Sequence, residues 1–181
     1  MKNLIYITLL IGLHLTQAQV KSEPYAFEVE LKKEIKAEKY QIKVPENRSD
    51  VNSRTIPLSF IKLKSRAKNP GYPILYLAGG PGGSGTRAMK GQRWLMFDQL
   101  RDIADVIILD QRGTGLSDAV PRCKSSVKIP YDQPTNESNY TKYHKQAATE
   151  CLQFLKDKGV DIKGYTTWES AADIEAVRKT L

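Results

Sequence analysis

The residues best suited to chemistry lie in the glycine-rich segment ILYLAGGPGGSG, residues 74–85. Its first four residues are apolar and predict a short buried strand, which runs directly into a turn dominated by glycine and proline. Because glycine has no Cβ, this backbone can adopt positive φ angles and leave its N–H groups uncovered. Bare amides at the end of a buried strand are suited to binding a developing negative charge, as in an oxyanion hole.

A second segment, VIILDQRGTGLSD at residues 106–118, repeats this design. The apolar run at 106–109 is typical of a parallel strand that is covered on both faces. Between the two turns, the apolar residues of segment 93–103 recur at helical spacing. A strand, a glycine turn, a helix and a second strand make a βαβ unit. The pattern predicts a catalytic α/β sheet.

Further elements are predicted on either side of this unit. Upstream, apolar and polar residues alternate in three segments that predict an antiparallel start to the sheet. These segments are 27–31, 40–44 and 55–63. Downstream, helices are predicted at 140–158 and 166–181, and the spacing of Thr166 and Glu169 fits a capping box. The last helix is expected to cover the sheet with one face, formed by Ser170, Ile174, Val177 and Leu181.

The first glycine turn also allows two nucleotide-binding interpretations. A Walker loop needs Lys and then Ser or Thr after its last glycine, whereas Thr86 and Arg87 follow Gly85 here. A dinucleotide fingerprint fits residues 80–85, but Pro81 removes a backbone donor from that string. Asp110 is the one acidic residue placed to bind a ribose, so this alternative stays open.

Ser84 is a candidate nucleophile in the same turn. A nucleophile elbow needs G-x-S-x-G between a strand and a helix, and additional glycines and a proline separate Ser84 from the strand. A serine nucleophile also needs a general base. Beyond the first 18 residues the chain has one histidine, His144, which lies in a polar stretch that offers nothing to orient it. We therefore interpret Ser84 as a loop residue.

The amino-terminal residues 1–18 are interpreted as a signal peptide. Lys2 is followed by an apolar run at 4–15 and a small-residue cleavage site at 16–18. The apolar run is shorter than the roughly 20 residues that a membrane anchor needs. We expect a secreted or periplasmic protein with no membrane association after cleavage. Residues 19–181 are enough for one modest domain.

The charge and the cysteines constrain the function further. The formal net charge is +8, but the basic residues are dispersed and are not interleaved with aromatic residues, so no nucleic-acid partner is expected. No metal site or cofactor is expected either. Cys123 and Cys151 form an even pair that predicts a disulfide in an oxidising compartment. Two unpaired thiols are the alternative.

The two glycine turns carry a resemblance to a known family. LAGGPGGSG followed by VIILDQRGTGLSD resembles the HGGPG and DQRGxGxS motifs of the α/β-hydrolase serine exopeptidases, the prolyl aminopeptidase and tripeptidyl aminopeptidase family. Segment 151–181 looks like the region just before the nucleophile strand of the secreted tripeptidyl-aminopeptidase branch, and segment 44–60 is similar to its amino-terminal strands. The resemblance implies the N-terminal portion of an α/β-hydrolase fold: leading antiparallel strands, then parallel strands with helices, ending before the nucleophile elbow.

The resemblance also assigns roles to individual residues. Gly79 and Gly80 match the glycines whose amides border the oxyanion hole, and Ala78 stands where the family has a histidine. Cys123 and Cys151 match positions that are often paired. Further residues match positions that support the active-site loops, with Arg112 as a buried or bridging cation. They are Pro81, Gly82, Asp110, Gln111, Arg112, Gly113, Gly115 and Ser117.

The implied function is that of an exported serine peptidase, which removes short units from the free N-termini of peptides through an acyl-enzyme. The catalytic triad is expected after Leu181, so the chain would carry the oxyanion loop and be inactive alone. Two alternatives remain. One is an esterase or lipase of the same fold. The other is a non-catalytic or split-gene product that needs a separate carboxy-terminal half.

Overall fold

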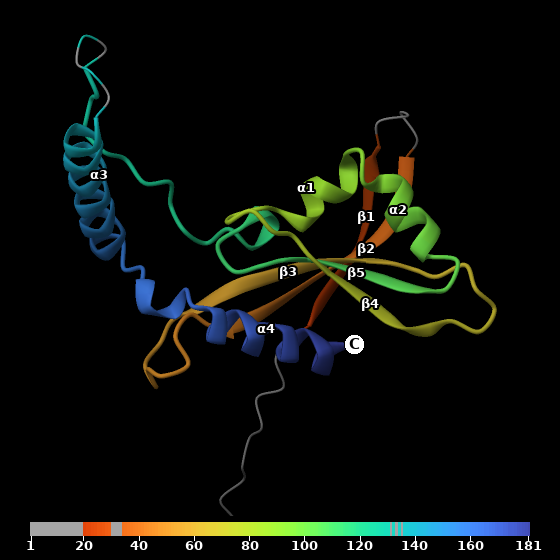
Figure 1. Cartoon of the computed structure of the whole chain (residues 1–181). Helices are drawn as coiled ribbons and strands as arrows, with labels where there is room; N and C mark the ends of the chain where they lie inside the picture. Colours follow the sequence, from red (N-terminus) through yellow and green to blue (C-terminus); the bar gives the residue numbers. More distant parts are fainter. Residues whose placement is uncertain (1–19, 30–33, 131, 133, 135) are drawn as a thin grey trace, which may run out of the picture.

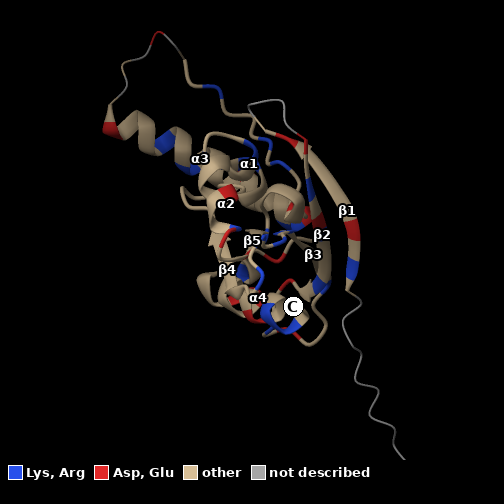
Figure 2. Cartoon of the chain, turned by 90° about the vertical axis from the view of Figure 1, so that its right-hand side faces the viewer, with Lys and Arg blue, Asp and Glu red and all other residues tan. Residues whose placement is uncertain are grey.

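The computed structural model describes residues 20–29, 34–130, 132, 134 and 136–181. The predicted signal peptide at residues 1–18 therefore lies outside the described residues. Within them, no helix is long and apolar enough to cross a membrane. Acidic and basic residues are interspersed along the ribbon (Figure 2).

A five-stranded mixed sheet forms the centre of the molecule (Figure 1). Its strands are ordered β1-β2-β3-β5-β4 across the sheet. Three neighbouring pairs, β1/β2, β2/β3 and β3/β5, are antiparallel, and β4/β5 alone is parallel. The strands are β1 (Lys21–Glu28), β2 (Glu34–Pro45), β3 (Thr55–Leu63), β4 (Gly71–Leu77) and β5 (Ala104–Asp110).

This sheet contradicts the predicted α/β-hydrolase fold. The βαβ pattern is present, but it supplies the one parallel pair, and the rest of the sheet is antiparallel with few helices. The physical reason is that the alternating segments form long strands, each of which pairs antiparallel with the next one along the chain. β3 then continues the antiparallel pairing onto β5, with Ser59 opposite Asp110.

The prediction of a buried first strand at 74–77 is also wrong. β4 is bonded to β5 on one side and forms the edge of the sheet. Its residues are half-buried or exposed, with Tyr72 at 96% and Leu77 at 40% exposure. By contrast, the apolar run of β5 is buried on both faces, as its sequence predicts.

Helices cover both faces of the sheet (Figure 1). α1 (Gly85–Lys90) and α2 (Trp94–Leu100) pack on one face, where Met89 and Phe97 join a core cluster with Ile61 and Val106. α4 (Thr167–Thr180) packs on the other face, where Val177 joins a cluster that includes Phe60 and Leu109. Successive side chains of β3 and β5 enter alternate clusters because strand side chains alternate between faces.

The helix α3 (Glu137–Asp157) extends away from the sheet and has no buried residue (Figure 1). Its N-cap is Asn136, whose side chain accepts a hydrogen bond from the backbone N–H of Asn139, so the helix begins slightly before the predicted start at residue 140. Two short 3-10 helices complete the fold, η1 (Gly115–Ser117) after β5 and η2 (Ile162–Gly164) before α4.

Candidate functional site

The two glycine turns are joined by one buried carboxylate, that of Asp110 at the end of β5. Thr86 donates two hydrogen bonds to it, from the backbone N–H at 3.0 Å and from Oγ1 at 2.6 Å. The Ser84 hydroxyl donates a third at 3.0 Å, and the N–H of Leu116 donates a fourth at 2.8 Å. Asp110 therefore fixes the start of α1 to the second turn. Both of its carboxylate oxygens accept hydrogen bonds from these two segments.

Ser84 has a structural role that accounts for its place in the turn. It is the N-cap of α1, and its Oγ accepts a hydrogen bond from the N–H of Arg87 at 3.1 Å. His144 lies on α3, with its ring against that of Tyr140 at 3.9 Å between centroids. The structure thus gives Ser84 a carboxylate partner and a helix to cap, and places His144 on the projecting helix.

Gly79 and Gly80 follow β4 and are exposed. Gly80 has φ +96°, a conformation that side chains strongly disfavour. Within the part of the chain that the structure describes, no backbone hydrogen bond is formed by the N–H of Gly79 or Gly80. The sequence places these amides at a strand end, and the structure leaves them open there. They can donate to an oxygen atom of a ligand.

The second turn is tied back to the sheet through Ser117. Its hydroxyl donates to the Asp110 carbonyl oxygen at 2.6 Å and accepts from the N–H of Ser59 at 2.7 Å. Gly115 packs directly on the Asp110 side chain. There is no room for a side chain at this position, since an added Cβ would lie 2.2 Å from Oδ2 of Asp110. The turn is therefore a rigid continuation of β5.

Arg112 is a buried cation that bridges several elements. Its side chain is 2% exposed, and it forms a bidentate pair with Asp173 of α4, from Nε at 2.8 Å and from Nη2 at 2.7 Å. Nη1 donates to the carbonyl oxygens of Glu46, at 2.6 Å, and of Gly164. One residue thus connects the second turn, the end of β2, η2 and α4.

Arg48, Glu169 and Asp173 complete this ionic cluster, and sequence reasoning missed all three. Arg48 pairs with Glu169 and, at 2.8 Å, with Asp173. The buried side of α4 therefore begins with two carboxylates, followed by the expected Val177, whereas the expected Leu181 is 48% exposed. The available signal was the i, i+4 spacing of Glu169 and Asp173, which puts both carboxylates on one helix face.

The capping box predicted for α4 forms only in half. Thr166 caps the N–H of Glu169 at 3.2 Å. The Glu169 side chain does not reach back to Thr166, because it accepts hydrogen bonds from the N–H and guanidinium of Arg48.

A further buried carboxylate, that of Glu46, lies next to this cluster. Burial raises its pKa, but hydrogen bonds from Arg54, Tyr165 and the N–H of Asp161 outweigh burial and hold the pKa below its usual value. Burial and the hydrogen bond to Glu46 in turn raise the pKa of the Tyr165 hydroxyl well above its usual value. The Glu46 carboxylate is thereby held ionised, and the Tyr165 hydroxyl is held protonated.

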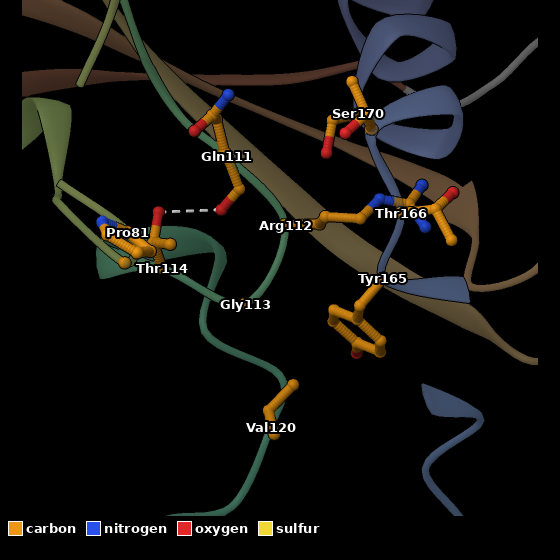
Figure 3. A pocket seen from close by; sticks show the side chains of 11 residues that line it. Pro81, Gln111, Arg112, Gly113, Thr114, Val120, Tyr165, Thr166 and Ser170 are labelled. Carbon is orange, nitrogen blue, oxygen red and sulfur yellow. Dashed lines mark hydrogen bonds between the residues drawn. The ribbon is translucent and has the colours of Figure 1, made fainter. Parts of the chain in front are cut away.

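A cavity of about 540 Å³ opens between the two glycine turns and the start of α4. Figure 3 shows Pro81 and Thr114 on one side and Tyr165 and Thr166 on the other, with the Arg112 side chain extending towards Thr166. The size is that of a small-ligand site. The lining residues are Pro81, Gly82, Gln111, Arg112, Gly113, Thr114, Val120, Tyr165, Thr166, Thr167 and Ser170.

Cys123 and Cys151 are disulfide-bonded, with Cα atoms 5.3 Å apart. The bond ties the loop after β5 to α3, at a place separate from the cavity. Next to it, Glu150 of α3 accepts hydrogen bonds from the N–H of Ser126 at 2.7 Å and from the hydroxyls of Ser125 and Ser126. These bonds, with one from Gln146, lower the pKa of Glu150 to about 2.

No group of three or more His, Cys, Asp or Glu side chains that could hold a metal ion occurs among the described residues. No protein-family model matches the chain, and no curated protein matches it.

Proposed function

We propose that this chain supplies the oxyanion-binding loop of an exported serine exopeptidase, which acts on short peptides with a free N-terminus. The observation that carries the proposal is the pair of open amides at Gly79 and Gly80, next to a cavity of about 540 Å³. Acyl transfer needs preorganised hydrogen-bond donors around its oxyanion, and two unpaired amides at a strand end can supply them.

The chemistry assigned to the loop is electrostatic. A serine Oγ attacks the peptide carbonyl carbon, and the carbonyl oxygen takes up the negative charge of the tetrahedral intermediate. The C–N bond then breaks, the amine leaves with a proton, and water hydrolyses the acyl-enzyme. The Gly79 and Gly80 amides bind the charged oxygen, each donor contributing roughly 3 kcal/mol. Ser84 is not the nucleophile in this proposal, because its hydroxyl caps α1 and is hydrogen-bonded to Asp110.

Asp110 and Arg112 act as positioning residues in this scheme. An oxyanion site works only when its donors are held before the charge develops. Asp110 fixes the carboxyl end of the first turn through Ser84 and Thr86, and Arg112 fixes the second turn against α4. Neither side chain is expected to contact the reacting atoms.

The test uses the protein in the length that its native gene encodes. Aminoacyl and tripeptidyl anilides with a free amino group should release aniline, and their N-acetylated counterparts should not. Gly80→Ala should lower kcat roughly 100-fold, because the side chain disfavours φ +96° and displaces an oxyanion donor. Gly91→Ala is the matched control, since Gly91 has a negative φ and room for a Cβ.

Three results would contradict the proposal. Hydrolysis of acyl esters but not anilides would favour an esterase or lipase. Peptide binding without any hydrolysis would favour a non-catalytic product. Activity that survives Gly80→Ala but is lost in Ser84→Ala would make Ser84 the nucleophile.

A further inference from the structure

The cavity lies next to the glycine turn that carries the Gly79 and Gly80 amides. Pro81 and Gly82, which directly follow Gly80, form part of its lining. The Gly79 and Gly80 amides therefore directly precede, in the chain, the residues that line this opening. What the cavity accepts is then decided by the charge and shape of its wall.

The wall carries no available charge. Arg112 is the one charged residue of the lining, and each of its five N–H donors faces an acceptor. Nε and Nη2 face Asp173 and Glu169, and the remaining donors face backbone carbonyl oxygens. Behind the wall, Arg48 and Arg112 are balanced by Glu169 and Asp173. An additional charge placed in the cavity would find no counter-charge.

The rest of the lining is neutral. The Tyr165 hydroxyl is engaged in a hydrogen bond to Glu46 at 2.8 Å. The aromatic ring is therefore the part of Tyr165 that is left to line the cavity. Val120 lies nearby: a Cβ on Gly113 would come 3.3 Å from the Tyr165 ring and 3.5 Å from Val120 Cγ2. The other side chains of the lining are those of Pro81, the uncharged amide Gln111 and the hydroxyl-bearing residues Thr114, Thr166, Thr167 and Ser170.

We infer that this cavity is a subsite for an uncharged aliphatic or hydroxylated side chain of the peptide, and that Val120 and Tyr165 determine this preference. The inference rests on the proposed function for the identity of the ligand as a peptide. Charged side chains are rejected because they would lose hydration without gaining a partner.

Binding is measured apart from hydrolysis, by calorimetric titration of the full-length protein with tripeptide amides. Three positional sets are used, X-Ala-Ala, Ala-X-Ala and Ala-Ala-X, with X as Val, Thr, Glu or Lys. At one position, the Val and Thr peptides should bind at least about tenfold more tightly than the Glu and Lys peptides. Val120→Asp should then favour Lys at that position, and Val120→Lys should favour Glu, each by about tenfold.

Val51→Asp is the matched control, since Val51 is 98% exposed and outside the lining. It should leave the order of affinities unchanged. Two charge variants of Val120 are used so that poor folding of one does not remove the test. Equal binding of neutral and charged peptides, or an order of affinities that ignores both Val120 variants, overturns the subsite. Peptide binding with the expected order but without hydrolysis overturns the peptidase and leaves the subsite standing.

Discussion

Arg112 and Asp173, which are 61 residues apart in the chain, form a bidentate ion pair in which each side chain is only 2% exposed. The pair attaches α4 to the turn that follows β5. Because the Arg112 donors are all engaged, the pair is structural, and it also keeps the cavity wall neutral. Its removal should therefore affect stability first.

Asp173→Ala should lower the free energy of unfolding by about 3–5 kcal/mol, because Arg112 stays buried without its main partner. Asp173→Asn should fall between wild type and Ala, since it keeps the shape and loses the charge. The measurement is chemical denaturation. Glu175→Ala is the control on the same helix: Glu175 is paired with Arg178 but is 47% exposed, so a loss within about 1 kcal/mol is expected. Equal losses at the two positions would contradict a structural role for the cluster.

Gly115→Ala should be more destabilising than Gly159→Ala, although both glycines have positive φ angles. At Gly159 the new Cβ meets nothing within 4 Å, so the cost is about 1 kcal/mol of backbone strain. At Gly115 the Cβ would lie 2.2 Å from Asp110 Oδ2, and displacing that carboxylate breaks its hydrogen bonds, adding ~1–3 kcal/mol. Thermal unfolding of the two variants side by side measures the difference. If the two lose the same stability, Asp110 does not depend on the close approach of Gly115.

Glu150 should titrate near pH 2, well below an ordinary glutamate. A lowered pKa in the folded protein means that the ionised carboxylate stabilises the loop against α3. That stabilisation is fully present above the unfolded value of about 4.5 and is lost as the pH falls towards 2. The Glu150 carboxyl and Ser126 amide resonances should therefore shift together over this range in an NMR titration. Glu150→Gln should remove the transition at Ser126, and a Glu150 midpoint at about 4.5 would show that the serine hydrogen bonds do not form in solution.

Local features were predictable because local physics sets them. The alternation at 55–63 gives β3, the apolar run at 106–109 gives the centre of β5, and Thr166 caps α4 as its spacing predicts. Each of these follows from side-chain periodicity or from a hydrogen bond that spans three residues. The antiparallel pairing of β1, β2 and β3 was expected as well. The antiparallel pairing of β3 with β5 was not, because it joins segments that are distant in the chain.

The ionic cluster was not predictable for the same reason. A helical face is recognised from its apolar residues, and Glu169 and Asp173 are counted as solvent-facing unless their partners are known. Those partners, Arg48 and Arg112, come from two separate loops. Burial of the two carboxylates therefore depends on how α4 docks, which no local pattern encodes.

The sequence by itself determined the position of β3 and of the centre of β5, the Thr166 cap, and that the Gly79–Gly80 amides follow a strand end, because these depend on neighbouring residues. It did not locate β1, which ends at Glu28 although a strand was predicted at 27–31. Only the tertiary structure decided that β4 is an edge strand, that Ser84 bonds to Asp110 and caps α1, and that Asp173 and Glu169 neutralise Arg112 in the cavity wall. These depend on contacts across 26 residues for Ser84 and 61 for Arg112, where chain spacing carries no information about distance in space.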